Sequence, residues 1–212
     1  NALGRMLEQH ISIPYRFICC TDQPENIDYE TFPLWEDPNK AEVEEGKPDN
    51  YRKLFFFSKE ADHLFGPKLF FMDLDVLIRS NIDDILSFDD DFRIMENRAA
   101  FYNSSFFLIQ NHSRRQVWED FDSYTSRQEV TTPGPSGGKM GGSDQAWISH
   151  ILGPHEKTWR PEHGVHHYAW YIKNRTLDDS DKMIFFPGPK YKPWLLDRTD
   201  IRNEYMLYYE GR

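Results

Sequence analysis

The hydrophobic positions of the chain fall into two patterns, helical spacing and short continuous runs, which is typical of helices packed on buried strands. Leu3, Met6 and Leu7 lie three and four residues apart, and this spacing predicts a helix over residues 2–10. Further helices are predicted over residues 51–64, 82–86, 114–124 and 144–148, the last with Ser143 as its N-cap.

Short apolar runs without helical spacing predict buried strands. The clearest run covers residues 68–72, between the breaker Gly66-Pro67 and the acidic Asp73. Other strands are predicted over residues 15–20, 92–95, 104–109, 163–172 and 183–186, with one short strand near Phe32.

Two segments predict loops. Residues 22–50 are rich in proline and acidic residues, and residues 133–142 contain seven Gly or Pro among ten, which predicts a mobile loop. The remaining alternation of helices with buried strands favours a three-layer α/β domain. A length of 212 residues suits one domain spanning residues 1–212, and 39% hydrophobic residues are enough for a packed core.

The charge balance restricts the classes of partner. Asp and Glu number 35 against 25 Lys and Arg, a net charge of -10, which repels a nucleic-acid backbone or an anionic membrane. The longest apolar runs have about four residues, whereas a membrane-spanning helix needs roughly 20, so we expect no membrane span. Cys19 and Cys20 are adjacent, which favours reduced thiols and a cytoplasmic location.

Asp73 and Asp75 are the strongest candidates for chemistry. Asp-x-Asp occurs four times in the chain, but only this copy comes directly off an apolar strand. Residues i and i+2 of an extended segment point the same way, and ligands of open α/β sheets bind at the strand ends. Two carboxylates there suit Mg²⁺ or Mn²⁺ completed by water and a diphosphate. From these residues alone, a pair of solvated acids remains the alternative.

Residues 68–86, reading KLFFMDLDVLIRSNIDDIL, resemble the core of GT-A glycosyltransferases, close to the glycogenin and bacterial galactosyltransferase group. Three further segments resemble family motifs in the family's order. Residues 102–108 resemble the strand beside the donor sugar, 143–147 the helix start near the reacting carbon, and 186–194 the closing phosphate-binding motif.

This resemblance implies a three-layer α/β/α domain of GT-A type, with a mixed, mostly parallel sheet. The sequence predicts no strand before residues 2–10, so we expect either a truncated copy without the family's first strand or another element in its place. It implies a metal-dependent enzyme that transfers a hexose from a UDP-sugar to an unknown glycan, lipid or protein acceptor, with retention of configuration. Mn²⁺ or Mg²⁺ would be held by Asp73 and Asp75, and Asp144 and Gln145 would be catalytic.

A departing diphosphate also needs cations and closely approaching backbone amides, and a sugar needs short polar side chains. The donor-binding candidates on these grounds and from the motifs are Lys53, Leu74, Asn103, Ser104, Gly188, Lys190 and Lys192.

Two alternatives remain open. Phe186 or Pro187 stands where the family places a third metal ligand, a histidine, and the upstream histidines His163, His166 and His167 are candidate substitutes. Because of this ligand position and, above all, the missing first strand, the alternative function is a degenerate or truncated relative that binds nucleotide or glycan without turnover. A metal-dependent phosphohydrolase also uses aspartates after a strand, but the later motifs fit a sugar donor better.

Overall fold

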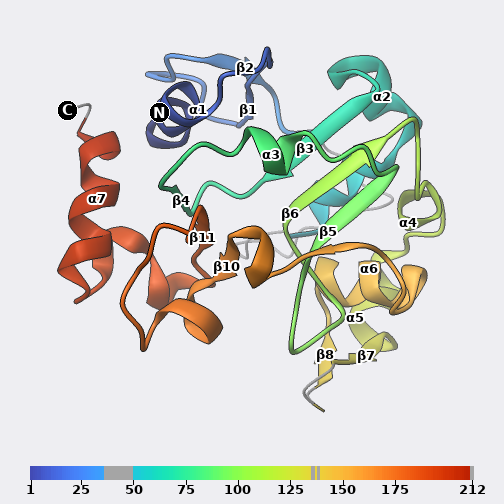
Figure 1. Ribbon diagram of the computed structural model, residues 1–212. Helices are drawn as coiled ribbons and strands as arrows, with labels where there is room; N and C mark the ends of the chain where they lie inside the picture. The colour runs from blue at the N-terminus through green and yellow to red at the C-terminus, as the bar shows by residue number, and fades with distance from the viewer. Residues whose placement is uncertain (36–49, 135–136, 138, 211–212) are drawn as a thin grey trace. The chain divides into compact units, whose positions relative to one another are not determined.

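The computed structural model of the chain describes residues 1–35, 50–134, 137 and 139–210. The chain forms two compact units (Figure 1). Each unit brings together distant parts of the sequence. Unit 1 comprises Asn1–Leu34, Asp73–Phe88 and Arg160–Arg212, and unit 2 comprises Trp35–Met72 and Asp89–Trp159. The prediction of a single domain over residues 1–212 stays a prediction.

Unit 2 contains a four-stranded sheet in the order β3-β6-β5-β9. β6 (Tyr102–Gln110) lies in the middle and pairs antiparallel with both β3 (Lys68–Met72) and β5 (Phe92–Glu96), as Figure 1 shows. β9 (Thr158–Trp159) joins the far side of β5 in parallel. The connection between β5 and β6 is short, and a short connection favours an antiparallel pair.

The core of unit 2 forms where helices pack on this sheet. Phe107 of β6 is fully buried, and its ring lies 4.8 Å from that of Phe71 and 5.2 Å from that of Phe57. On the opposite face of the sheet, Phe106 stacks on Trp159 at 4.3 Å. The helices of unit 2 are η1 (Asn50–Phe57), α2 (Lys59–Phe65), α4 (Gln116–Glu119), α5 (Ser123–Gln128) and α6 (Asp144–Leu152).

Unit 1 contains a three-stranded sheet in the order β10-β11-β4, in which every residue is buried. β11 (Met183–Phe185) pairs in parallel with β10 (Val165–His167) and antiparallel with β4 (Val76–Ile78). A separate parallel pair is formed by β1 (Ile18–Cys20) and β2 (Glu30–Phe32). The helices of unit 1 are α1 (Ala2–His10), α3 (Asp83–Leu86), η2 (Pro161–His163), η3 (Tyr168–Ile172), η4 (Pro189–Tyr191), η5 (Pro193–Leu195) and α7 (Thr199–Tyr209).

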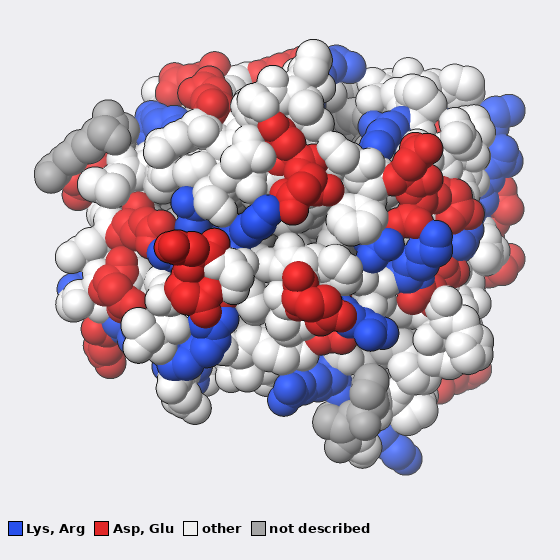
Figure 2. Space-filling view, viewed as in Figure 1, with Lys and Arg blue, Asp and Glu red and all other residues white. Residues whose placement is uncertain are grey.

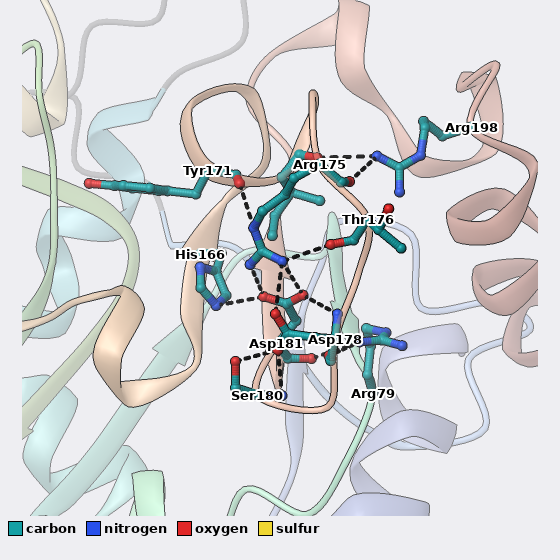
Figure 3. A network of polar contacts seen from close by, with 10 residues as sticks. Arg79, His166, Tyr171, Arg175, Thr176, Asp178, Ser180, Asp181 and Arg198 are labelled. Atoms are coloured by element: carbon teal, nitrogen blue, oxygen red, sulfur yellow. Dashed lines mark hydrogen bonds and ion pairs between the residues drawn. The ribbon is translucent and has the colours of Figure 1, made fainter.

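A polar network around the buried Asp181 stabilises the segment that leads into β11 (Figure 3). The carboxylate of Asp181 is fully buried and accepts a hydrogen bond of 2.9 Å from Nη1 of Arg175. Nε2 of His166 lies 2.9 Å from the other oxygen of Asp181. Arg79, just after β4, donates to the Asp181 carbonyl and to Glu204 of α7. The network therefore connects β4, β10, α7 and the start of β11.

The predicted helices over residues 2–10, 82–86 and 144–148 are confirmed. Two other predicted helices are each divided into two helices in the structure. The predicted helix over residues 51–64 is two helices, because Oγ of Ser58 accepts from the Ala61 amide and begins α2. The predicted helix over residues 114–124 is also two, because Asp122 caps the amide of Thr125 and begins α5. Polar capping side chains restart the helix at both places.

Three predictions of strand and loop need correction. Of residues 163–172, only Val165–His167 form a strand, and Tyr168–Ile172 form a π-helix instead. Of the run 15–20, only Ile18–Cys20 pair in the sheet, because β2 is only three residues long. Part of the predicted loop over residues 133–142 is strand instead, because β7 (Thr131–Pro133) pairs antiparallel with β8 (Lys139–Gly141).

The α/β class with mixed sheets is confirmed, but parallel pairing does not predominate. Three of the seven pairings among the described strands are parallel and four are antiparallel. The three-layer arrangement stays a prediction. Residues 36–49, about half of the predicted loop 22–50, lie outside the described residues, as do residues 135, 136 and 138. No helix of the described segments is long and apolar enough to cross a membrane.

Candidate functional site

A pocket of about 560 Å³ lies in unit 1, beside the start of β4. Its charged side is formed by Asp73, Asp75 and Lys192, with Leu74 at its edge. Residues 1–4, at the start of α1, contribute another side. Aromatic side chains line much of the rest, namely Phe17, Tyr29, Trp194, Tyr205 and Tyr209. The pocket thus combines charged groups with flat apolar surfaces.

Asp73 and Asp75 border this pocket together, but for a different reason than the one predicted. The segment between β3 and β4 is not extended, because residues 74 and 75 form a bend. The amide of Phe186, just after β11, donates to the Asp75 carbonyl at 3.0 Å. The end of β11 therefore fixes this bend, and the bend brings the two aspartates to one pocket.

Asp75 has two polar neighbours within unit 1. Its Oδ2 lies 2.5 Å from Nζ of Lys192, and the two side chains are 19% and 28% exposed. Burial, and secondly the charge of Asp75, raise the pKa of Tyr205 to about 12. The Tyr205 phenol therefore stays protonated at neutral pH and remains a hydrogen-bond donor.

The closing motif places only one of its two lysines at the pocket. Lys192 lies between the short helices η4 and η5 and borders the pocket, whereas Gly188 and Lys190 do not line it. Nζ of Lys190 instead lies 5.6 Å from the centre of the Tyr191 ring. Gly188 has a φ of +59°, and an added Cβ would meet nothing within 4 Å, so backbone conformation rather than crowding favours glycine there.

A second group of predicted residues meets in unit 2. Asp144 is the first residue of α6, which Ser143 caps by accepting from the Ala146 amide. Asp144 is 2% exposed, and its carboxylate accepts a hydrogen bond from Oγ of Ser104 in β6. Nζ of Lys53 lies 3.4 Å from the same Asp144 oxygen and 3.4 Å from the Ser104 hydroxyl. This triad is mostly buried.

The neighbours of this triad have partners of their own. Oδ1 of Asn103 accepts from the Ser105 amide at 2.8 Å, at the start of β6. Oε1 of Gln145 accepts from Nδ2 of Asn97 at 2.7 Å. Sequence reasoning missed Asn97, and its place just before the turn that joins β5 to β6 is the signal that indicates it.

Sequence reasoning also missed α7 and the tyrosines that it places at the pocket. Ile201, Tyr205 and Tyr208 are buried and lie at helical spacing, which is the signal that predicts this helix. The two groups of predicted residues belong to different compact units. That they form one site stays a prediction.

The two carboxylates at the pocket suit a hard divalent cation such as Mg²⁺. Mg²⁺ is usually bound by one or two carboxylates, with water and substrate phosphates completing its six oxygens. Asp73 and Asp75 supply two carboxylates, and no cluster of three or more His, Cys, Asp or Glu side chains occurs among the described residues. These aspartates therefore suit a cation whose other ligands come from a diphosphate.

The three histidines proposed as substitute ligands are engaged elsewhere. Nδ1 of His163 accepts from the Arg160 amide at 3.0 Å. His166 lies against Asp181, and the ring of His167 stacks on Trp170 at 4.0 Å. None of the three lines the pocket, so the structure does not support their substitution for the family's histidine.

The surface carries both signs of charge. On the face shown in Figure 2, Lys and Arg side chains lie interspersed with Asp and Glu rather than in one basic field. The net charge of -10 thus coexists with local cations such as Lys192.

Comparison with solved structures identifies the fold. An active-site mutant of LgtC matches 99% of this chain and 90% of its own, with 14% sequence identity and a TM-score of 0.63. The galactosyltransferase LgtC in complex with donor and acceptor sugar analogs matches the same shares, with 15% identity and a TM-score of 0.57. The chain has the GT-A fold of glycosyltransferases.

A third match is longer than this chain. The glycosyltransferase GlyE of Streptococcus pneumoniae TIGR4 matches 74% of the chain, with 13% identity and a TM-score of 0.50. The chain spans only 43% of GlyE, less than half its length. No protein-family model matches the sequence. No curated protein matches it either.

Proposed function

We propose that the chain is a glycosyltransferase that transfers a hexose from a UDP-sugar to a glycan, lipid or protein acceptor. The observation that carries this proposal is the pocket of unit 1, where Asp73, Asp75 and Lys192 come together in a chain of GT-A fold. The match to a galactosyltransferase holding donor and acceptor sugar analogs supports the choice of a sugar nucleotide as donor and a glycan as acceptor.

Each part of the pocket suits one part of such a donor. The aromatic side chains offer flat surfaces for a nucleobase, and Lys192 offers a point charge for a diphosphate. A Mn²⁺ or Mg²⁺ ion held by Asp73 and Asp75 would neutralise the charge that develops on the leaving diphosphate. Leu74, 64% exposed between the two aspartates, would contact the donor.

The triad of unit 2 suits the sugar end of the reaction. The donors Ser104 and Lys53 hold the carboxylate of Asp144 in one orientation, and a fixed orientation is what makes contact with a reacting sugar productive. We assign Asp144 and Gln145 to the reacting sugar and Asn103 to its hydroxyl groups. Retention of configuration follows from the resemblance to the glycogenin group and belongs to this proposal.

Turnover tests the proposal directly. UDP release from UDP-glucose and UDP-galactose is measured with and without Mn²⁺ for the full chain and for Asp73→Asn, Asp75→Asn and Asp144→Asn. We expect metal-dependent release that falls about 100-fold in each variant, the order seen when one stabilising group is removed from an active site.

Asp120→Asn is the matched control, because Asp120 is an exposed aspartate from another Asp-x-Asp pair. It should release UDP at the rate of the original chain. Undiminished release in both Asp73→Asn and Asp75→Asn would exclude the proposed metal role.

A second candidate function is binding without turnover, and one observation favours it. Phe186, one of the two residues at the position of the family's third metal ligand, is 3% exposed and packs against Tyr168 at 5.2 Å. A phenylalanine cannot ligate a metal ion. Under this alternative, calorimetry shows Mn²⁺-dependent binding of UDP while no sugar nucleotide is cleaved; detectable cleavage by the purified chain would rule it out.

A further inference from the structure

The contact between Lys192 and Asp75 has a consequence for how the pocket is filled. The ammonium group of Lys192 lies 2.5 Å from Oδ2 of Asp75, and both residues line the pocket. Side-chain exposures of 28% and 19% shield the pair from much of the solvent. One of the two carboxylates proposed for the metal is therefore already neutralised within the protein.

This ion pair weakens the binding of a divalent cation at the pocket in two ways. The ammonium occupies an oxygen that the metal would use, and two cations a few ångströms apart repel each other. A diphosphate reverses both effects, because it offers the ammonium several charged oxygens in place of one carboxylate.

We propose that Lys192 couples the binding of the nucleoside diphosphate to that of the divalent cation. In the ligand-free protein Lys192 pairs with Asp75. When the diphosphate enters, the ammonium group moves onto its oxygens, and the released Asp75 carboxylate joins Asp73 in binding the cation. No covalent bond changes in this exchange. This inference rests on the proposed function, because it assumes that the pocket receives a nucleoside diphosphate.

The surroundings of Lys192 allow this movement. Its backbone is extended, with φ of -61° and ψ of 133°, and lies between two proline-initiated turns, η4 and η5. These turns hold the backbone, so the exchange needs only a change of side-chain rotamer. The Tyr205 phenol, which feels the charge of Asp75, is a neutral donor and does not replace the charge of Lys192.

Linkage makes the coupling reciprocal, so each ligand should strengthen the binding of the other by the same factor. In the original chain, UDP should raise the affinity for Mn²⁺, and Mn²⁺ should raise the affinity for UDP. A direct bond between metal and phosphate would also produce this coupling. The distinguishing measurement is therefore the binding of Mn²⁺ without any nucleotide.

The test measures Mn²⁺ binding by the full chain from the electron paramagnetic resonance signal of free Mn²⁺. Without nucleotide, Lys192→Gln should bind Mn²⁺ about fivefold more tightly than the original chain, the factor expected when one partly exposed ion pair no longer competes. Lys192→Arg, which keeps the charge, should bind Mn²⁺ as weakly as the original chain. With UDP present, the coupling factor should be smaller in Lys192→Gln.

Lys173→Gln is the matched control for the loss of one positive charge in unit 1. Nζ of Lys173 contacts the Tyr191 hydroxyl at 3.4 Å, and Lys173 does not line the pocket. Its affinity for Mn²⁺ should equal that of the original chain. Equal affinities in Lys192→Gln and the original chain would overturn the inference, as would a similar gain in Lys173→Gln.

The inference and the proposed function fail in distinguishable ways. If the chain releases UDP from a sugar nucleotide but Lys192→Gln binds Mn²⁺ no more tightly, only the coupling is overturned. If Lys192→Gln gains affinity for Mn²⁺ and UDP strengthens Mn²⁺ binding, but no sugar nucleotide is cleaved, the coupling stands and the transferase proposal fails. Absence of Mn²⁺ binding to every variant, even with UDP, overturns both.

Discussion

At the scale of single residues, Asp144 shows how a buried carboxylate is kept in place. It accepts from the Ser104 hydroxyl and lies within 3.4 Å of the Lys53 ammonium, and these partners come from β6 and η1. A first-turn position on α6 also favours a negative charge, since the amides of a helix N-terminus carry partial positive charge. Three elements of unit 2 thus stabilise one charge.

The hydroxyl of Ser104 should therefore contribute measurably to stability. Ser104→Ala leaves a nearly buried carboxylate without one of its donors, and we expect the free energy of unfolding to fall by about 1–3 kcal/mol. Urea unfolding followed by tryptophan fluorescence measures this loss. Ser104→Thr keeps a hydroxyl and should lose less. Equal stability of Ser104→Ala and the original chain would show that Lys53 alone satisfies Asp144.

Cys19 provides a chemical reporter of the unit 1 pocket. Cys19 borders the pocket. Burial, and secondly the adjacent Cys19, raise the pKa of the Cys20 thiol to about 11. Because the thiolate is the reactive form, a maleimide should label Cys19 well before Cys20. UDP with Mn²⁺ should slow this labelling, which mass spectrometry of the intact chain measures.

Two variants control this labelling experiment. Cys19→Ser should lose the fast labelling, and Cys20→Ser should keep it together with its protection by UDP. Labelling of Cys19 at one rate with and without UDP would show that the nucleotide does not enter this pocket, even if it binds elsewhere on the chain.

At the scale of elements, the network around Asp181 joins four segments of unit 1. Its carboxylate faces Arg175 and His166, while Arg79 connects the Asp181 carbonyl to α7 through Glu204 (Figure 3). The network lies directly before β11, and the end of β11 fixes the bend at Asp75. The geometry of the pocket therefore depends on a buried carboxylate outside it.

Removal of this carboxylate should be costly. Asp181→Ala removes the acceptor of the Asp178 amide and of the partly exposed Arg175, and we expect a loss of about 1–3 kcal/mol in the free energy of unfolding. Asp179→Ala changes an exposed aspartate two residues away, and its effect should stay within about 0.5 kcal/mol. Thermal unfolding of the two variants measures the difference. Similar transitions would show that Arg175 is satisfied by solvent and backbone groups.

At the scale of the whole molecule, buried histidines make stability depend on pH. Burial lowers the pKa of His167 to about 4 from a usual value of 6.5, and its Nδ1 has no hydrogen-bond partner within the described part of the chain. Burial also lowers the pKa values of His10 and His166. The unfolded chain therefore binds protons below pH 6.5 that the folded chain does not.

The sign of the resulting pH dependence follows from linkage. The contribution of His167 is fully present above pH 6.5 and is lost as the pH falls from 6.5 towards 4, by up to about 1.4 kcal/mol per pH unit. Urea unfolding at pH 7, 5.5 and 4.5 measures this slope. His167→Phe keeps a ring against Trp170 but cannot titrate, so its slope should be smaller. His155→Gln, at an exposed position, should keep the original slope.

Local signals in the sequence were sufficient for several elements and motifs of this molecule. The helices at residues 2–10 and 144–148, the cap at Ser143 and the strand Lys68–Met72 were predictable, because periodicity and capping act within a few residues. The candidate Asp73 was recognisable for the same reason, since it directly follows an apolar strand, whereas Asp144 was indicated by the resemblance to the family's motif.

Contacts between distant residues settled the rest. Lys192 rather than Lys190 lies at Asp75, across 117 residues of sequence, and α7 supplies Tyr205 to the same pocket. Strand direction was equally inaccessible, because pairing depends on which segments meet and not on the residues of one strand. Local composition records which chemistry is available, whereas the packing of remote segments decides which groups share a pocket and which partners hold their charges.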